Sequence, residues 1–358
     1  SRINPTIGLT YKPTENYSTY ISYSESNRAP TSIELGCSNP NAACLLPTQM
    51  ADDPPLDDVV SKTYEVGARG KLSNDIQWNA AIYHAMNHDD LQFVSKNAVN
   101  GLGYFDNIGR TQRDGLDFGI SGDRLPLTFL SEETQNKLSW NASYGLTHAT
   151  YDSDLTLTSP ANSSAATSDT SYSEIDDDDD FYTEAVGQLA TSYSFIDDDE
   201  EFYQEALDNG DIGIGDEIAV KNDVINIKKG DQLANLPMHR IKLRLNYEIT
   251  SKFRIGTSAV GFSKAYAMGN ENQKHNGDGE VPGYVLMNLD ATYIPAKDWT
   301  VAFKAINILD KNYYTGGRLL QNAFTGVDNN TRSTPFSGIG VMPGSPQAAW
   351  VTVTYDFK

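Results

Sequence analysis

The chain contains 358 residues, of which 39% are hydrophobic, and its 48 Asp and Glu against 27 Lys and Arg give a formal net charge of -21. No stretch approaches 18 consecutive apolar residues, which excludes a transmembrane helix, and the negative charge repels phosphate backbones, which argues against a nucleic-acid partner. With 20 Tyr, 13 Phe and 28 Gly the composition favours strands and turns, so we expect an all-β protein.

Eleven segments alternate apolar and polar residues with a period of two, which is the period of a strand with two different faces. In the sixth segment, for example, Leu138 and Trp140 share one face, and Ser139 and Asn141 share the other. The segments are, in chain order, 3–12, 17–24, 60–72, 76–96, 102–124, 138–147, 241–249, 253–267, 285–293, 299–305 and 351–358.

The only two cysteines, Cys37 and Cys44, lie in a stretch rich in Pro, Asn and Asp that reads as an exposed loop. A structural zinc ion would need four ligands, and no His or further Cys stands nearby. We therefore predict a local disulfide that pins this loop, which requires an oxidising compartment. Two free thiols are the alternative.

Short and long connections alternate between the segments. The short ones are 13–16, 73–75, 125–135, 250–252 and 296–297, and the largest of the long ones are about 28–59, 153–235 and 310–346. A soluble β-sandwich also alternates along its strands, but it has no reason to sort its loops by length. Transmembrane β-barrels do so, with short periplasmic turns and longer extracellular loops. We therefore predict an antiparallel transmembrane β-barrel.

Aromatic residues recur beside the short connections on the apolar face. Rings at one level favour an interfacial girdle, because an amphipathic ring prefers the headgroup boundary of a bilayer. Ordinary packing at strand ends is the alternative. The residues concerned are Tyr11, Tyr17, Trp78, Tyr247, Phe253, Tyr293 and Trp299.

Eleven is an odd number of strands, whereas single-chain bacterial barrels have even numbers. Lipid also cannot satisfy the unpaired backbone N–H and C=O groups at an open sheet edge. We therefore expect residues 1–358 to be the C-terminal half of a 22-stranded barrel, the size of plugged outer-membrane transporters. Ser1 also leads straight into strand-like sequence without a signal-peptide pattern. The first strand would start at the extracellular rim and the last would end at the periplasmic rim.

Three motifs occur in the chain in a familiar order: Tyr-Glu-Val-Gly-Ala-Arg at 64–69, Asn-Ile-Gly-Arg-Thr-Gln-Arg-Asp-Gly-Leu-Asp at 107–117, and Asn-Ile-Leu-Asp-Lys-Asn-Tyr-Tyr at 307–314. Together they resemble the strands of TonB-dependent outer-membrane receptors. The family's plug domain and TonB box precede the barrel, and neither is found in this chain. We interpret Asn307 and Asp310 as turn and rim residues in preference to ligand-binding residues.

The resemblance implies active uptake of a scarce nutrient, most often a ferric siderophore or a similar metal chelate, across the outer membrane of a Gram-negative cell. It implies as partners the TonB complex, reached through the missing N-terminal region, outer-membrane lipid and lipopolysaccharide, and the chelate, with a monomeric barrel. A passive porin is the main alternative. We do not expect an enzyme, because the five His show no i, i+4 pair and no Gly-x-Ser-x-Gly elbow occurs.

The connection 310–346 combines aromatic and hydrogen-bonding residues, which suits an amphipathic chelate whose flat faces and oxygens need different partners. Packing of the loop against itself to close the mouth is the alternative. The predicted substrate-binding residues are Tyr313, Tyr314, Arg318, Asn322, Phe324 and Phe336.

The connection 153–235 contains a duplicated acidic segment, in which residues 171–185 recur as 192–206 with eleven of fifteen positions identical. Between Glu174 and Glu217 there are 17 carboxylates and no Lys or Arg. Such oxygens suit Ca²⁺ or Mg²⁺, although the spacing of a calcium-binding loop is missing, and a solvated acidic surface is the alternative. No other cofactor is expected. The candidate cation ligands are Asp176, Asp177, Asp178, Asp197, Asp198 and Asp199.

We predict that this acidic segment responds to divalent cations. Repulsion among its carboxylates falls as multivalent cations accumulate around them, so millimolar Ca²⁺ or Mg²⁺ should slow hydrogen exchange across residues 171–217. The comparison is made with and without Ca²⁺ at a fixed ionic strength. Identical exchange under both conditions would reject cation binding and leave a solvated acidic surface.

Overall fold

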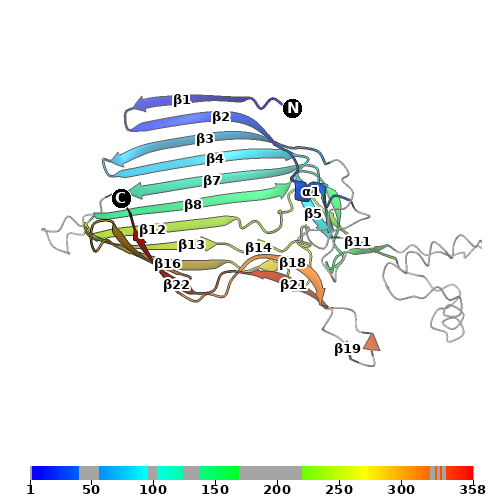
Figure 1. Ribbon diagram of the computed structural model, residues 1–358. Coiled ribbons are helices and arrows are strands. Elements are labelled where there is room, and N and C mark those ends of the chain that lie inside the picture. The colour runs from blue at the N-terminus through cyan, green and yellow to red at the C-terminus, as the bar shows by residue number, and fades with distance from the viewer. Residues whose placement is uncertain are drawn as a thin grey trace, which may run out of the picture. The chain divides into compact units, whose positions relative to one another are not determined.

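The computed structural model describes residues 2–39, 56–95, 103–123, 137–168, 220–322, 327–328, 331–332 and 336–357. The chain divides into two compact units, Ser1–Ser164 with Val224–Lys358, and Ala165–Asp223. The fold described below is that of the first unit (Figure 1). In the described part of the chain, no helix is long and apolar enough to cross a membrane.

Within the described residues, eleven strands form one antiparallel sheet in which successive sheet strands are neighbours in space. This confirms the predicted meander, which forms an open sheet with β1 and β22 at its edges. Its strands are β1 (Thr6–Thr14), β2 (Tyr17–Arg28), β3 (Val59–Ser73), β4 (Ile76–His88), β7 (Thr111–Gly122), β8 (Lys137–Tyr151), β12 (His239–Thr250), β13 (Phe253–Phe262), β16 (Tyr284–Tyr293), β17 (Trp299–Ile306) and β22 (Ala348–Tyr355).

Two of the predicted strands are each broken in two. The segment 76–96 forms β4 and then β5 (Leu91–Ser95), and the segment 102–124 forms β6 (Gly103–Asn107) and then β7. The breaks lie at Asp89 and Gly109, whose φ angles of 54° and 85° do not fit a strand. The alternation is interrupted at both bends, because Leu91 and Phe93 are out of phase with Ile82 and because polar residues occupy 110–114, so the interpretation of each segment as one strand is wrong.

One face of the sheet is apolar and exposed. The strand register places apolar residues side by side across many strands, because a fixed register keeps alternate side chains on the same face. Ile82 and Leu245 are 57% and 45% exposed, which is unusual for large apolar residues and fits a face that does not meet water. One such row runs through Leu9, Ile21, Val66, Ile82, Leu116 and Leu146.

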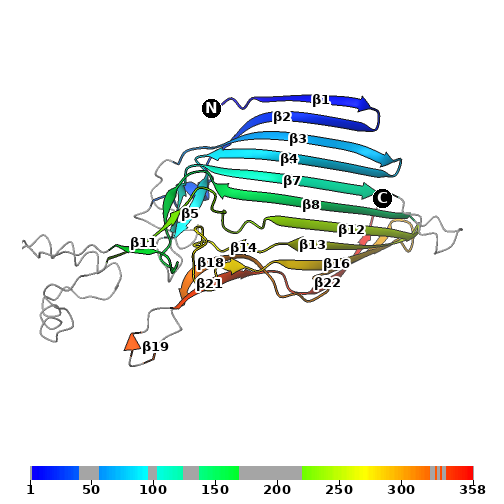
Figure 2. The ribbon, with the colours of Figure 1, turned by 180° about the vertical axis from the view of Figure 1, so that it is seen from behind.

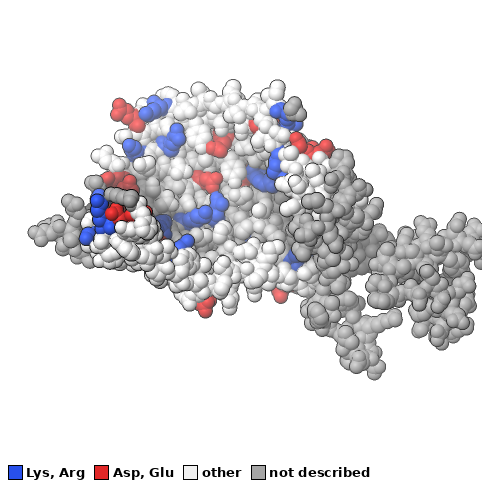
Figure 3. Space-filling model, viewed as in Figure 1, with Lys and Arg blue, Asp and Glu red and all other residues white. Residues whose placement is uncertain are grey.

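The opposite face of the sheet is polar. The sheet curls so that β22 approaches the viewer of Figure 1, and the view from behind in Figure 2 agrees. The polar face is therefore the inner one, and charged side chains are scattered over it (Figure 3). On this face Arg244 donates two hydrogen bonds to the carboxylate of Asp290, at 2.6 and 2.9 Å.

The two ends of the sheet differ as the sequence predicts. Because successive strands are antiparallel, the turns 251–252 and 294–298 lie at one end, whereas the connections 29–58 and 307–347 lie at the other. The aromatic band at the short-turn end contains Tyr17 with Trp78 at 6.1 Å between ring centres, Phe253 with Tyr293 at 6.4 Å, and Trp299 with Tyr355 at 4.9 Å. The chain enters the sheet at the long-connection end and leaves it at the short-turn end.

The long connections carry the remaining described elements and much of the buried apolar surface. A small apolar cluster there contains Ala161, Ala267 and Leu319, with Ile339 packed against it. The elements are α1 (Ser32–Leu35), β5, β6, β9 (Leu155–Thr158), β10 (Ala166–Ser168), β11 (Val220–Ile227), β14 (Ala265–Tyr266), β15 (Glu280–Val281), β18 (Tyr314–Asn322), β19 (Val327–Asp328), β20 (Thr331–Arg332) and β21 (Phe336–Pro343). Of these, β10 and the first residues of β11 belong to the second unit.

Several predicted features lie outside the described residues. They include Cys44, so the Cys37–Cys44 disulfide stays a prediction, although Cys37 itself is buried. They also include Phe324, the short turn 125–135 and the acidic segment with its six candidate cation ligands, Asp176, Asp177, Asp178, Asp197, Asp198 and Asp199.

We predict that Gly115→Val destabilises the sheet by about 1–3 kcal/mol, the usual cost of overfilling a packed site. The Tyr83 ring lies over Gly115 and hydrogen-bonds the Thr147 hydroxyl at 2.9 Å, so a Cβ at position 115 collides with that ring. Gly8→Val is the matched control, because its Cβ meets Ile21 O at an ordinary 3.5 Å. Equal free energies of unfolding for the two variants in denaturant titrations would contradict the prediction.

Candidate functional site

An aromatic stack lies on the inner face of the sheet at its long-connection end. Phe262 and Tyr284 are register partners on β13 and β16, and their ring centres are 5.2 Å apart. Tyr313, which follows β17, extends the stack with its ring centre 4.6 Å from that of Tyr284. The planes of neighbouring rings are tilted by 46° and 41°, so what we call the aromatic stack is a cluster of inclined rings. Their faces offer apolar surface to a ligand that has flat faces of its own.

The position of Tyr313 is fixed by its local contacts. Its ring lies directly against Gly344, where any side chain would collide with it, and its hydroxyl accepts a hydrogen bond of 3.0 Å from the Ser345 N–H. Asn307, which is buried, accepts a bond of 2.9 Å from the Lys311 N–H and donates to Ser345 O at 3.2 Å. Asn307 and Asp310 have φ angles of 49°, which agrees with the prediction that both are turn residues.

A guanidinium group lies beside this stack. Arg240 on β12 is the register partner of Phe262, so both project to the inner face, and Arg240 lies 4.0 Å from the carboxylate of Asp117 on β7. About half of each charged side chain remains exposed. The inner face at this end therefore combines aromatic rings with an accessible cation.

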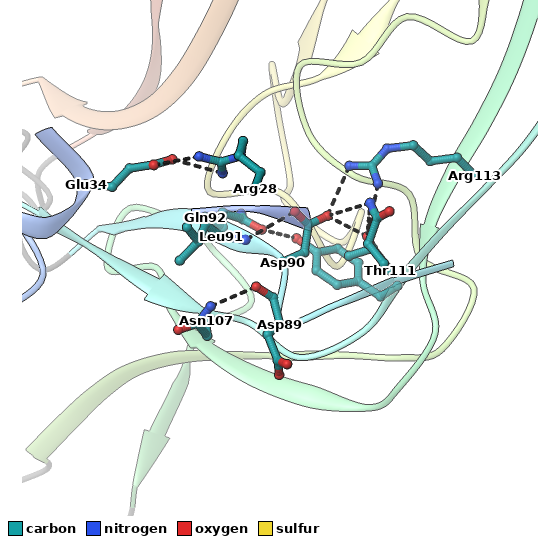
Figure 4. Close-up of polar contacts among 11 residues, drawn as sticks. Arg28, Glu34, Asp89, Asp90, Leu91, Gln92, Asn107, Thr111 and Arg113 are labelled. Atoms are coloured by element: carbon teal, nitrogen blue, oxygen red, sulfur yellow. Dashed lines mark hydrogen bonds and ion pairs between the residues drawn. The ribbon is translucent and has the colours of Figure 1, made fainter. Parts of the chain in front are cut away.

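The hairpin formed by β5 and β6 is anchored at its base by Asp90, as Figure 4 shows. The Asp90 carboxylate accepts hydrogen bonds from the Thr111 hydroxyl at 2.6 Å and from Arg113 at 3.0 Å. Asn107 donates to Asp89 O at 2.7 Å, and this bond holds the strained backbone at Asp89. The hairpin is thus fixed to β7 at its root.

A buried carboxylate lies between the connections. Glu271 is 3% exposed and accepts hydrogen bonds from the Gly269 N–H at 2.9 Å and from Gln92 Nε2 at 3.1 Å. The hydroxyl of Tyr151 donates a hydrogen bond to Oε1 of the same Gln92 amide at 2.7 Å. Burial raises the pKa of Glu271, and its hydrogen bonds and Arg318 partly offset that rise.

Arg318 is the predicted binding residue whose surroundings are best defined. Its guanidinium donates to the Ser95 hydroxyl at 2.7 and 3.2 Å and lies 5.1 Å from the centre of the Phe93 ring. Burial lowers the pKa of Arg318, and the charge of Glu271 opposes that effect. Its side chain is therefore engaged with the β5–β6 hairpin.

A second polar cluster joins the connection after β8 to the connection after β13. Asn162 donates to Gly269 O at 2.7 Å, and the Ser163 N–H donates to His275 Nδ1 at 3.0 Å. Because a backbone N–H can only donate, Nδ1 of His275 must be unprotonated. Burial lowers the pKa of His275, which favours this neutral form.

The predicted binding residues are only partly brought together. Tyr313 lies in the aromatic stack, Tyr314 is exposed on β18, and Arg318 contacts β5, while Asn322 and Phe336 are described only as paired strand residues. Their role as ligand contacts stays a prediction. Sequence reasoning missed Gln92, Glu271 and His275, because a polar residue in a connection gives no signal of burial. Among the described residues, no group of three or more His, Cys, Asp and Glu could hold a metal ion.

A family model described as "TonB dependent receptor-like, beta-barrel" matches residues 1–308. The chain is 23% identical over 309 residues to the "Probable TonB-dependent siderophore receptor PiuA" of Acinetobacter baumannii, covering 86% of this chain and 30% of that protein.

Solved structures with the same fold include that siderophore receptor, PiuA, at a TM-score of 0.50 and 16% identity. They also include the ferric yersiniabactin uptake receptor FyuA of Yersinia pestis at 0.51 and 11%, and the copper transporter OprC at 0.53 and 11%. These matches cover 98–99% of this chain and 35–39% of the three structures, so the chain spans little more than a third of their length.

We predict that the contact between Ser163 and His275 is lost in acid. A His whose pKa is lowered in the folded state contributes stability above its ordinary pKa of about 6.5 and loses it as the pH falls below that value. Hydrogen exchange at 162–164, corrected for intrinsic rates, should accelerate as the pH falls from 7 to 5. His275→Asn, which keeps an acceptor that does not titrate, should remove this dependence. An unchanged pH profile in this variant would contradict the assignment.

Proposed function

The chain belongs to the TonB-dependent receptors, matching their β-barrel domain, and from this membership we propose that it forms part of an outer-membrane receptor for a metal chelate. The cargo class is a ferric siderophore or a similar chelate, taken up with energy from the TonB system. The siderophore receptor PiuA, which matches most of this chain, supports that class. Transport rather than catalysis is the proposed activity.

The observation that carries this proposal is the aromatic stack of Phe262, Tyr284 and Tyr313 beside Arg240 on the inner face. Rings can bury the flat faces of an organic chelate, and a guanidinium group can pair with its anionic oxygens. Sites of this kind are mostly apolar, with a few polar groups that fix orientation. The exposed apolar outer face supports placing the sheet in a lipid bilayer.

The transport proposal is tested with the complete protein that contains this chain, expressed in a Gram-negative host that lacks its own ferric-chelate receptors. Uptake of radioactive iron is measured from a panel of ferric catecholate, hydroxamate and carboxylate siderophores. We expect at least one chelate to accumulate well above the vector control, and uptake to cease when TonB is deleted or the proton-motive force is collapsed. Uptake that survives both treatments would indicate a passive channel, and no uptake by correctly inserted protein would reject the proposal.

The site itself is tested with Tyr313→Ala. Loss of the Tyr313 ring should weaken chelate binding several-fold, because aromatic contacts contribute about 0.5–1.5 kcal/mol beyond area burial. Tyr293→Ala is the matched control, since Tyr293 is an exposed tyrosine of the short-turn band. Equal affinities of the two variants for the transported chelate would show that the stack does not contact it.

A further inference from the structure

Asn276 and Gly277 form an exposed tip of the connection after β13, in the part that lies between β14 and β15. This is the one place in the described ranges where an asparagine is followed directly by a glycine. The same connection carries Glu271, which is buried, and His275, which accepts a hydrogen bond from the connection after β8. Water therefore reaches the tip, although the residues around it are well packed.

The backbone is anchored on both sides of this tip. Before it, the Asn276 N–H donates to Ser163 Oγ at 2.7 Å, which joins the connection after β13 to the connection after β8. After it, the buried Gly279 carbonyl accepts hydrogen bonds from the Ala267 N–H at 2.9 Å and from Asn270 Nδ2 at 3.0 Å. The tip is thus a short exposed segment between two fixed points.

The polar groups at the tip itself are unbonded. Within the residues that the structure describes, no hydrogen bond engages the Gly277 N–H or the side-chain amide of Asn276. Gly277 has a φ angle of 116°, which favours glycine, and it has no side chain to shield its nitrogen. The nearest atom to the position of a Cβ there is His275 Nε2, at 3.9 Å. The nitrogen of Gly277 is therefore accessible to the preceding side chain.

These two groups can react with each other. The Gly277 nitrogen attacks Cγ of Asn276 and gives up its proton, the bond from Cγ to Nδ2 breaks, and ammonia leaves, so that a succinimide ring forms. Water then opens the ring at one of its two carbonyl groups, which yields either aspartate or isoaspartate. The net reaction consumes one water and releases one ammonia. It is intramolecular, so proximity alone promotes it, and asparagine is thermolabile in proteins.

The buried asparagines of the same connection lack this freedom. Asn270 Nδ2 donates to Gly279 O at 3.0 Å, and Asn272 Nδ2 donates to Ser164 Oγ at 2.8 Å. Rotation of either side chain toward the following nitrogen would break these bonds and leave buried polar groups unpaired, which is costly. The structure therefore distinguishes one reactive asparagine from its neighbours.

We propose that Asn276 is a site of spontaneous deamidation in the folded protein, and that its conversion to isoaspartate loosens the contact between the connections after β8 and after β13. Isoaspartate lengthens the backbone by one carbon between two fixed points. The new carboxylate also adds a negative charge at the tip. The proposal is independent of the transport function, because it follows from the contacts of the tip alone.

The reaction is followed in the complete protein, kept folded in detergent micelles and incubated in mildly alkaline buffer. A synthetic peptide of residues 270–282 is the unfolded reference. We expect Asn276 in the folded protein to convert at a rate within about tenfold of that in the peptide, because an exposed tip opens at almost no cost in free energy. An isoaspartate-specific methyltransferase and radioactive methyl donor identify the product.

An internal control lies in the same tryptic fragment. Trypsin cleaves on both sides of residues 275–297, a fragment that contains Asn276 and Asn288. The amide of Asn288 donates to Ser258 Oγ at 3.3 Å and accepts from the Asn307 N–H at 3.0 Å. Asn288 should therefore remain intact in mass spectra in which Asn276 has converted.

The effect on the contact is tested by hydrogen exchange at residues 162–164, before and after incubation and at one pH. Exchange should be several-fold faster after conversion of Asn276. Asn276→Gln is the matched variant, because it keeps an amide but would have to close a larger ring. It should neither convert nor change its exchange on incubation.

The outcomes separate the two parts of the proposal. Intact Asn276 in the folded protein, under conditions in which the synthetic peptide converts, would overturn the modification site. Equal conversion of Asn276 and Asn288 would attribute the reaction to unfolding and reject the site as well. Conversion of Asn276 without faster exchange at 162–164 would leave the site in place and overturn its effect on the contact between the connections.

Discussion

The structure depends on one constraint, namely that every sheet strand must keep two different faces in the same register as its neighbours. A slip of one residue would exchange the faces of a whole strand. The register across β7, β8 and β12 places Leu116, Leu146 and Phe118 on the outer face and Asp117 and Arg240 on the inner one. The aromatic stack, the ion pair and the outer apolar band are consequences of that register. Glycines that admit tyrosine rings, such as Gly115 under Tyr83, let bulky inner residues lie across neighbouring strands.

The long connections are stabilised by a different kind of interaction. They carry much of the buried apolar surface, but their described apolar cluster is small. Buried amides and hydroxyls therefore hold them together, and such groups favour a single arrangement because an unmatched buried polar group is costly. Glu271 and Asn162 illustrate this, since each bonds a connection that is distant in the sequence. The register of the sheet fixes which side chains lie on its inner face, and the long connections lie at one end of that sheet.

The sequence predicts the sheet well because alternation is a local property of each strand. It places the eleven strands, the ends at which they turn and the apolar face. The bends at Asp89 and Gly109 are not predicted, because the segments 76–96 and 102–124 are each interpreted as one continuous strand although their alternation is interrupted at these residues. The hydrogen bond between Gln92 and Glu271, 179 residues apart, is not predicted either, because it depends on how β5 packs against the connection after β13. Arg318 is predicted as a binding residue from its chemistry, but its contact with Phe93 and Ser95 depends on how β5 packs against β18.

Spin-label accessibility shows directly whether the apolar face of this sheet meets lipid and the polar face lines an aqueous lumen. Labels are attached at Ile82, Leu116 and Leu245 on the outer face and at Asn79, Asp117 and Asn246 on the inner face of the complete protein in lipid bilayers. We expect the outer labels to relax with oxygen and to be shielded from a water-soluble nickel chelate, and the inner labels to show the reverse. Equal access of the nickel chelate to both sets would contradict this expectation.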